Sequence, residues 1–254
     1  RRPPRSTLSS SSAASDVYKR QDKLYFWYKT KKIGRILSED NSEEEAINYI
    51  NKNFNSIKKP TEKILYDYAN INKGFEKYEI AIEYYTELLK NVDQSSYAIS
   101  RILYRRGSSY ERTGNYEKAD RDLIESLKMY PNEPYTLNYL AYSWLERNYK
   151  IDEAIDMIQK AHKQKENDPY ITDSVGWGFY LIGDYINAEK YLKKALQLMP
   201  DDPIVNDHYG DVLWKLNKKL QAKYYWQAVL GLEETEDEMK SKVKSKLLEG
   251  LEKS

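Results

Sequence analysis

The residues that could carry chemistry in this chain gather near its C-terminal end. Only two histidines occur, and one of them, His208, stands between Asp207 and Asp211 in a segment with helical spacing. A histidine and an aspartate three positions apart share a helix face, so they could form a loose metal site. No third strong ligand can be read nearby, and a histidine with a structural role accounts better for the pattern. We therefore predict neither a metal site nor a catalytic residue here.

Other enzyme signatures are missing from the sequence as well. It has no phosphate-binding loop, no glycine-rich dinucleotide fingerprint, no serine elbow and no cysteine. The closest carboxylate pairs, such as Glu233 and Glu234, lie in a polar tail and indicate a solvated helix start. We expect a protein that is not an enzyme and that needs no cofactor.

The charge balance narrows the class of partner. Lys and Arg number 41 against 40 Asp and Glu, which gives a net charge of +1. Such a balance provides no overall attraction to nucleic acid or to an anionic membrane. No apolar run approaches the roughly 18 residues of a membrane span. A protein or peptide partner is the remaining expectation.

A fixed period organises the elements that must position these residues. Six times, a small residue is followed by an alanine about twelve positions later, in the pairs Gly34/Ala46, Ala69/Ala81, Gly107/Ala119, Ala141/Ala154, Gly176/Ala188 and Gly210/Ala222. Successive pairs are 34 to 38 residues apart, which is typical of stacked supersecondary units. We expect the small residues where the two antiparallel helices of each unit cross closely.

Residues 169–202 are the clearest copy. Apolar residues recur there at helical spacing on both sides of Gly183-Asp184, which breaks the helix. Pro200 ends the second helix, and Pro203 opens the next unit at a position where proline is tolerated. Residues 100–133 repeat the pattern. The sequence therefore predicts helix-turn-helix units.

These features resemble the tetratricopeptide (TPR) repeat over about residues 27–232. The resemblance implies an all-α fold, a right-handed α-solenoid of helix-turn-helix repeats. We expect a degenerate repeat at 22–60, repeats at 61–99, 100–133, 134–168, 169–202 and 203–234, and a capping helix at 235–254. In that last helix the acids come first and the lysines follow, with Val243, Leu247, Leu248 and Leu251 as one apolar stripe. A helix lying on a membrane surface is the alternative for this segment.

The first 21 residues follow a different pattern. They are rich in serine and arginine, have no apolar periodicity and are predicted to be disordered. Residues 16–21 reverse-translate into a string that resembles a transposase mosaic end from a sequencing adaptor. We interpret the segment as translated adaptor, in which case the native N-terminus is missing and further repeats could precede it. A genuine disordered tail is the alternative.

Three C-terminal segments extend the resemblance. Residues 137–144, 173–177 and 206–214 look like a group of proteobacterial TPR proteins, many of them exported and some of them outer-membrane lipoproteins. Ala141 and the pair Lys218-Lys219 depart from that pattern without threatening the fold. The resemblance implies a periplasmic or outer-membrane-associated adaptor, and a cytoplasmic location stays open.

In TPR stacks the first helix of each unit lines the concave groove. The residues expected there, flanking the small position, are Asn138, Tyr142, Asp173, Trp177, Tyr180, Asp207, Asp211 and Trp214. Rings beside carboxylates suit an extended peptide, especially a basic or aromatic one. The alternative is that the tryptophans pack between helices while the aspartates cap helices or face solvent.

The function that follows is a non-catalytic scaffold or adaptor that binds a partner protein or peptide in this groove. Two alternatives stay open: a regulatory TPR fragment of a larger enzyme, and a glycan- or peptidoglycan-binding module. Some family members clamp a chaperone's terminal carboxylate with basic groove residues. Here Arg105 and Arg106 form the only basic pair near a groove, so we expect no such co-chaperone.

Overall fold

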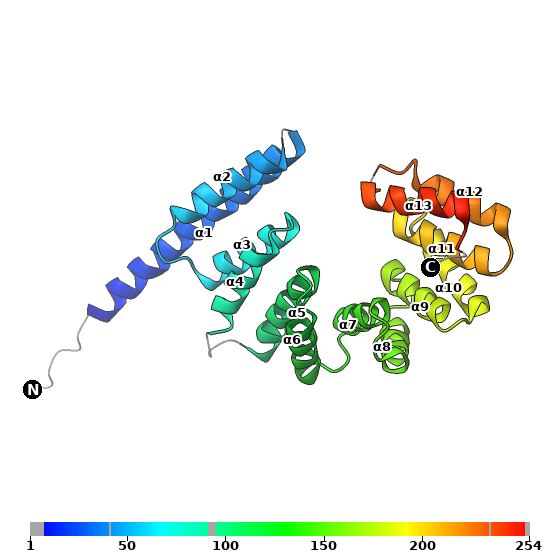
Figure 1. Cartoon of the computed structure of the whole chain (residues 1–254). Helices are drawn as coiled ribbons and strands as arrows, with labels where there is room; N and C mark the ends of the chain where they lie inside the picture. The colour runs from blue at the N-terminus through cyan, green and yellow to red at the C-terminus, as the bar shows by residue number, and fades with distance from the viewer. Residues whose placement is uncertain (1–7, 41, 91–94, 234, 252–254) are drawn as a thin grey trace, which may run out of the picture. The chain divides into compact units, whose positions relative to one another are not determined.

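The computed structural model describes residues 8–40, 42–90, 95–233 and 235–251. Within these ranges the chain forms thirteen α-helices and no strand (Figure 1). Consecutive helices pair and pack on each other, and the chain divides into two compact units, residues 1–125 and 126–254. The predicted all-α class of stacked helix pairs is confirmed.

The N-terminal unit contains three helix pairs. They are α1 (Leu8–Asp40) with α2 (Glu43–Asn55), α3 (Glu62–Gly74) with α4 (Tyr78–Leu88), and α5 (Ser96–Arg112) with α6 (Tyr116–Met129), whose last residues belong to the second unit. Aromatic rings form much of the core, where Phe54 stacks on Tyr68 with centroids 3.6 Å apart and Trp27 packs edge-on against both. This core fixes α3, α4 and α5, which carry a cavity considered below.

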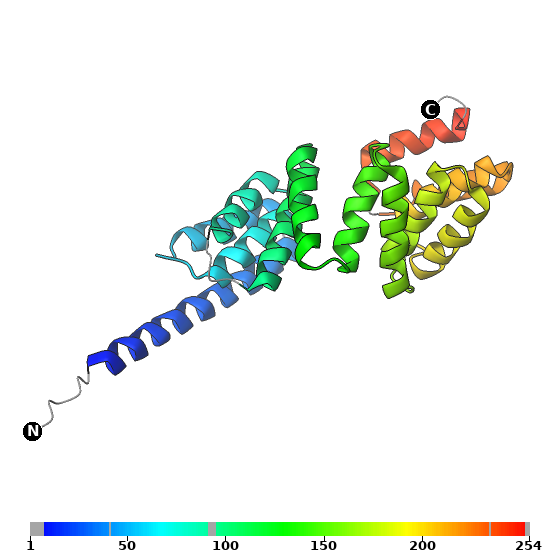
Figure 2. The ribbon, with the colours of Figure 1, turned by 90° about the horizontal axis from the view of Figure 1, so that it is seen from below.

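The C-terminal unit contains three further pairs and a final helix. They are α7 (Pro134–Glu146) with α8 (Ile151–Gln164), α9 (Pro169–Leu181) with α10 (Tyr185–Leu198), and α11 (Pro203–Lys215) with α12 (Lys219–Val229), followed by α13 (Asp237–Glu249). The first helices α7, α9 and α11 contact one another in order, and each second helix packs behind its partner (Figure 2).

Local sequence explains where these helices begin. Pro134, Pro169 and Pro203 each occupy the first turn of a helix, where a missing N–H costs no hydrogen bond. Acidic residues before them cap the helix, as when Asp202 Oδ1 accepts from the backbone N–H groups of Ile204 and Val205. These caps set the starting points of α7, α9 and α11.

The turns inside the pairs depend on residues that tolerate a left-handed backbone. Gly183 adopts a φ of 82° between α9 and α10. Asn217 has a φ of 60° between α11 and α12, next to the Lys218-Lys219 departure. Asparagine visits this region more readily than most residues, so the turn forms without glycine.

The predicted close helix crossings are found at the glycines of the period. A Cβ atom added at Gly176 would meet Leu192, and one added at Gly210 would meet the ring of Trp226. Gly34 and Gly107 repeat this relation with Ile50 and Leu123. Each glycine therefore faces a side chain one turn beyond the alanine of its pair. The added Cβ atoms at Gly107 and Gly210 would also lie 3.2 and 3.3 Å from the backbone oxygens of the paired alanines, which are buried.

The N-terminal tail also differs from the expectation. Helix α1 runs from Leu8, so residues 8–21 are helical rather than disordered, and residues 1–7 lie outside the described ranges. Once a helix has nucleated, each added residue costs little, and alanine propagates it well. Among the side chains described, the first to be buried is Trp27.

Among the described residues, no helix combines the length and the apolar character that crossing a bilayer requires.

Candidate interaction face of the C-terminal unit

The predicted groove residues all lie on the first helices of the C-terminal pairs. Asn138 and Tyr142 are on α7, Asp173, Trp177 and Tyr180 are on α9, and Asp207, Asp211 and Trp214 are on α11. We call the surface formed by α7, α9 and α11 the first-helix face. Many of these side chains contact one another or the last helix, α13, as the following paragraphs describe.

Trp177 lies at the centre of an aromatic stack. Its ring is nearly parallel to Tyr180, with centroids 4.6 Å apart, and to His208, with centroids 4.0 Å apart. Its indole Nε1 donates a hydrogen bond to Glu146 Oε1 at 2.6 Å. The half-buried indole therefore connects α7, α9 and α11 and exposes part of its surface on the face.

His208, a member of this stack, also forms a buried pair with Asp173. Nδ1 of His208 lies 3.0 and 3.1 Å from the two carboxylate oxygens of Asp173. Burial alone would lower the pKa of His208, but the charge and hydrogen bond of Asp173, with smaller contributions from Asp207 and Asp211, raise it above the ordinary value. The histidine thus has a structural partner one repeat away.

The acids of α11 bind a lysine from α13. The Nζ atom of Lys246 lies 2.8 Å from both carboxylate oxygens of Asp207 and from both of Asp211. Trp226 Nε1 donates a further hydrogen bond to Asp211 at 2.9 Å. Burial, and then the charge of Asp207, raise the pKa of Asp211 to about 6. One ammonium group thus bridges two neighbouring carboxylates.

Helix α13 is held against α11 and α12 by apolar contacts as well. Val243 and Leu251 are buried in the same cluster as Trp226. Gly250, with a φ of 76°, lies so close to the ring of Trp214 that an added Cβ would overlap it. Leu248 is 84% exposed, so the predicted apolar stripe is only partly buried.

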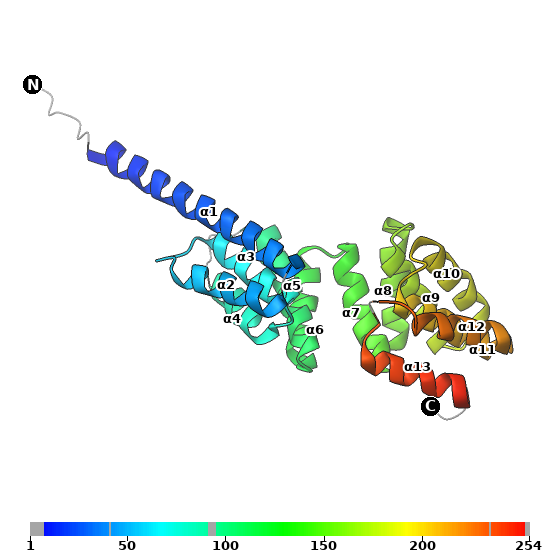
Figure 3. The same ribbon diagram turned by 90° about the horizontal axis from the view of Figure 1, so that it is seen from above.

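The direction of α13 brings it across the first-helix face (Figure 3). The pKa of Lys242 is raised, mainly by a hydrogen bond with Glu238 and to a smaller extent by Asp207 and by Glu146 of α7. Meanwhile Leu220 on α12 stays 87% exposed. Helix α13 therefore contacts the face that carries the candidate site and leaves part of α12 uncovered.

Two further predicted groove residues, Asn138 and Trp214, lie in different environments. The side-chain oxygen of Asn138 is buried without a hydrogen-bond partner among the described residues. Trp214 packs at a tilt against Trp226, with centroids 5.2 Å apart, and Lys219 Nζ lies 4.9 Å from its ring centroid. Trp214 thus belongs mainly to the docking site of α13. Across the described ranges no cluster of three potential ligands is arranged for a metal ion.

Sequence reasoning missed Lys246 and Glu146, the two charged residues that complete this arrangement. Lys246 is one of four lysines at alternate positions of α13, and no periodic signal singles it out. Glu146 ends α7 at the position one repeat before Tyr180 and Leu181. Because neither Tyr180 nor Leu181 carries a charge, the repeat pattern does not single out Glu146 either.

The two histidines are expected to titrate on opposite sides of the ordinary imidazole pKa of about 6.5. Burial, followed by the charge of Lys194, lowers the pKa of His162, whereas that of His208 is raised. Protonated His208 therefore contributes stability that is present below about pH 6.5 and is lost as the pH rises through its folded pKa. An NMR titration of the two imidazole signals checks this, with His208→Gln as the assignment control. If both signals titrate below pH 6.5, the prediction is wrong.

Comparison with known proteins supports the repeat assignment. Residues 100–133 match the tetratricopeptide repeat family model. The TPR repeat-containing protein PA4667 of Pseudomonas aeruginosa is 33% identical over 152 residues, which cover 54% of this chain and 26% of that protein. Anaphase-promoting complex subunit 3 of Schizosaccharomyces pombe is 24% identical over 120 residues, covering 47% and 16% respectively. The chain thus spans only a minor part of these relatives.

Solved structures share the fold. The thermophilic TPR protein TTC0263 of Thermus thermophilus superposes with a TM-score of 0.62 at 17% identity, covering 74% of this chain and all of that one. MamA of Desulfovibrio magneticus RS-1 gives a TM-score of 0.56 at 17% identity, covering 69% and 97%. These likenesses, the matched repeat and the successive helix pairs agree with one another. Residues 100–133 are therefore a tetratricopeptide repeat, and the described helix pairs share the fold of solved proteins built from such repeats.

Proposed function

We propose that this protein is a non-catalytic interaction scaffold whose first-helix face binds a basic segment of a partner protein. The contact between Lys246 and the pair Asp207 and Asp211 carries the proposal. In this contact the first-helix face binds the ammonium group of a lysine that belongs to α13 and not to a helix pair. Stacked helix repeats mostly serve as binding surfaces.

The part of the face beyond Lys246 offers the groups that such a segment needs. Glu146 presents an exposed carboxylate, and Trp177 and Tyr180 present half-buried rings beside it. Tyr135 and Tyr170, on the first turns of α7 and α9, are 46% and 64% exposed. A cation near these rings gains from the acid and from cation–π attraction. A lysine- or arginine-bearing segment with an aromatic residue fits this chemistry best.

The expected location is a bacterial envelope, where the protein would act as an adaptor. This part of the proposal rests on the resemblance of residues 137–144, 173–177 and 206–214 to exported repeat proteins. The complete gene is the test: a signal peptide or lipid-attachment motif ahead of the repeats supports export, and a catalytic domain in the same reading frame would instead make the chain a regulatory part of an enzyme.

Replacing Trp177 with alanine is expected to weaken binding of a basic peptide by about 2 kcal/mol, which is roughly thirtyfold and the scale of an interface hot spot. The probe is an acetylated, amidated peptide of alternating lysine and tyrosine, with glutamate in place of lysine in the negative control. Titration calorimetry of wild type and variant gives the two affinities. Because the ring also stacks on His208 and Tyr180, a modest fall in melting temperature accompanies the loss.

Tyr224→Ala provides the matched control. Tyr224 is 69% exposed on α12, away from the first-helix face, so its loss should leave peptide affinity unchanged. A Glu146→Gln variant should weaken binding without removing the ring. Equal affinity of the wild type for the lysine and glutamate peptides would refute the proposal, as would a Trp177→Ala variant that binds normally.

A further inference from the structure

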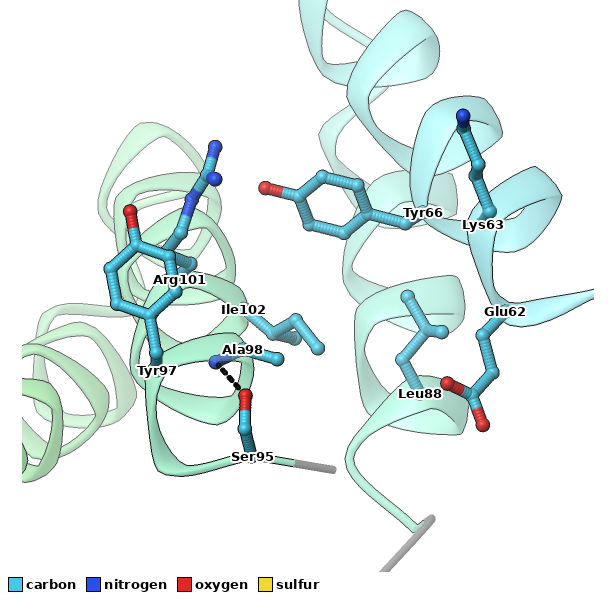
Figure 4. Close-up of a pocket in the computed structure, with 9 residues that line it drawn as sticks. All are labelled: Glu62, Lys63, Tyr66, Leu88, Ser95, Tyr97, Ala98, Arg101 and Ile102. Atoms are coloured by element: carbon cyan, nitrogen blue, oxygen red, sulfur yellow. Dashed lines mark hydrogen bonds between the residues drawn. The ribbon is translucent and has the colours of Figure 1, made fainter. Parts of the chain in front are cut away.

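The N-terminal unit contains a cavity of different chemistry. It has a volume of about 430 Å³ and opens between α3, α4 and α5. Figure 4 shows Tyr66 and Lys63 projecting from α3 on one side, Arg101 from α5 on the other, and Leu88 and Ile102 between them. The lining residues that the structure describes all belong to this unit.

Positive charge is concentrated at this cavity. Arg105, one helical turn after Arg101, donates from Nε to the hydroxyl of Tyr66 at 2.9 Å. Among the described residues, Lys63, Arg101 and Arg105 form no ion pair. Glu62 is the one acid among the described residues that line the cavity. Within the described ranges the cations therefore outnumber the acid and have no carboxylate partner of their own.

The next residue in the sequence, Arg106, is by contrast paired with a carboxylate. Arg106 holds both carboxylate oxygens of Asp122, at 2.6 and 3.0 Å, and donates to Thr86 at 3.1 Å. Its charge is satisfied by α6 and it ties α4, α5 and α6 together. Of two consecutive arginines, Arg106 is paired within the fold, whereas Arg105 donates to Tyr66, a residue that lines the cavity.

The electrostatic environment along α3 and α5 agrees with an excess of positive charge. The pKa of Lys73 is lowered, first by burial and then by the charges of Arg105 and Arg112. An anion bound on this side would relieve that repulsion. The buried side chains of Leu88 and Ile102, each 3% exposed, give the cavity an apolar wall as well.

We propose that this cavity binds an acidic peptide segment, with an aliphatic side chain against Leu88 and Ile102 and flanking aspartate or glutamate carboxylates on Arg101 and Arg105. Arginine suits this role because its planar guanidinium pairs with a carboxylate through two parallel hydrogen bonds. The tyrosine ring of Tyr66 supplies a further wall. The site is independent of the first-helix face and prefers a segment of opposite charge.

The test uses the whole chain and a fluorescein-labelled peptide of alternating glutamate and leucine, amidated at its C-terminus. Fluorescence anisotropy should show saturable binding that weakens as salt increases. The same peptide with glutamine for glutamate should bind at least tenfold more weakly. Absence of saturable binding by the wild type would overturn the proposal, and so would equal binding of the glutamine peptide.

A charge-reversal variant tests peptide binding at the cavity without disrupting the fold. Arg101 is exposed on α5, so Arg101→Glu should keep the helical circular dichroism and raise the dissociation constant for the glutamate peptide at least tenfold. Arg121→Gln, on α6 with a side chain 68% exposed, is the matched control and should bind like wild type. Unchanged affinity of Arg101→Glu would overturn the assignment. Displacement of the peptide by an equal concentration of inorganic phosphate or of a thymidine oligonucleotide would overturn its specificity for carboxylates.

Discussion

Replacing Lys246 with methionine should lower the free energy of unfolding of the C-terminal unit by about 3–5 kcal/mol, the usual cost of leaving a buried charge without its partner. The side chains of Lys246, Asp207 and Asp211 are 19%, 15% and 6% exposed, so water can replace little of the lost ammonium. Methionine keeps most of the aliphatic volume, and the effect therefore reports mainly on the charge. Urea denaturation followed by circular dichroism gives the value.

Lys244→Met is the matched control, because Lys244 lies on the exposed side of α13. It should change the stability by less than about 0.5 kcal/mol, as is usual for surface substitutions. Limited proteolysis adds a local readout: cleavage within α13 should accelerate in Lys246→Met and not in Lys244→Met. Equal stability of the two variants would show that the lysine is not important for docking α13.

The loss in Lys246→Met should also depend on pH. The folded-state pKa of Asp211 is raised to about 6, above the roughly 3.9 of an unfolded chain. The cost of burying its charge therefore appears as the pH rises from about 4 through 6 and is absent when the carboxyl group is protonated. Without Lys246 this cost is larger, so the stability deficit should be greatest above pH 6 and shrink toward pH 4. A deficit independent of pH would contradict this account.

The position of α13 illustrates what a single sequence can and cannot predict. The order of acids before lysines and the apolar residues predicted a helix here, and α13 is present. Which residues face inward depends on the docking register, set by Val243, Leu251 and the close contact of Gly250 with Trp214. Leu248 points outward for the same reason. Such tertiary contacts leave no local trace in the spacing of residues.

The candidate site on the first-helix face could likewise be predicted from the sequence only in part. Periodicity placed Trp177, Asp173 and Asp207 on first helices because each repeat presents equivalent positions on the same side. Their partners come from other elements: Asp173 pairs with His208 of the next repeat, and Asp207 with Lys246. Contacts between repeats depend on how adjacent helices pack, so they required the three-dimensional structure. Whether the exposed parts of Trp177 and Tyr180 bind a partner stays a prediction.

The helix crossings give the second large expected effect. Gly176→Ala should destabilise the C-terminal unit by about 1–3 kcal/mol, the range typical of overpacked cores. An added Cβ would lie 2.5 Å from Cγ and 2.9 Å from Cδ2 of Leu192, and 3.0 Å from its backbone nitrogen. A change of the Leu192 rotamer cannot relieve the backbone contact, so α9 and α10 must separate slightly.

Gly178→Ala, on the same helix, controls for the change in backbone entropy. Its added Cβ would lie 3.4 Å from Leu145 and 3.6 Å from Ile155, which are ordinary contacts. Alanine favours a helix over glycine by up to about 1 kcal/mol, so this variant should be neutral or more stable. Thermal unfolding of both variants, compared with wild type, separates crowding from helix propensity. If Gly176→Ala were as stable as Gly178→Ala, close approach of the helices could not explain the glycine.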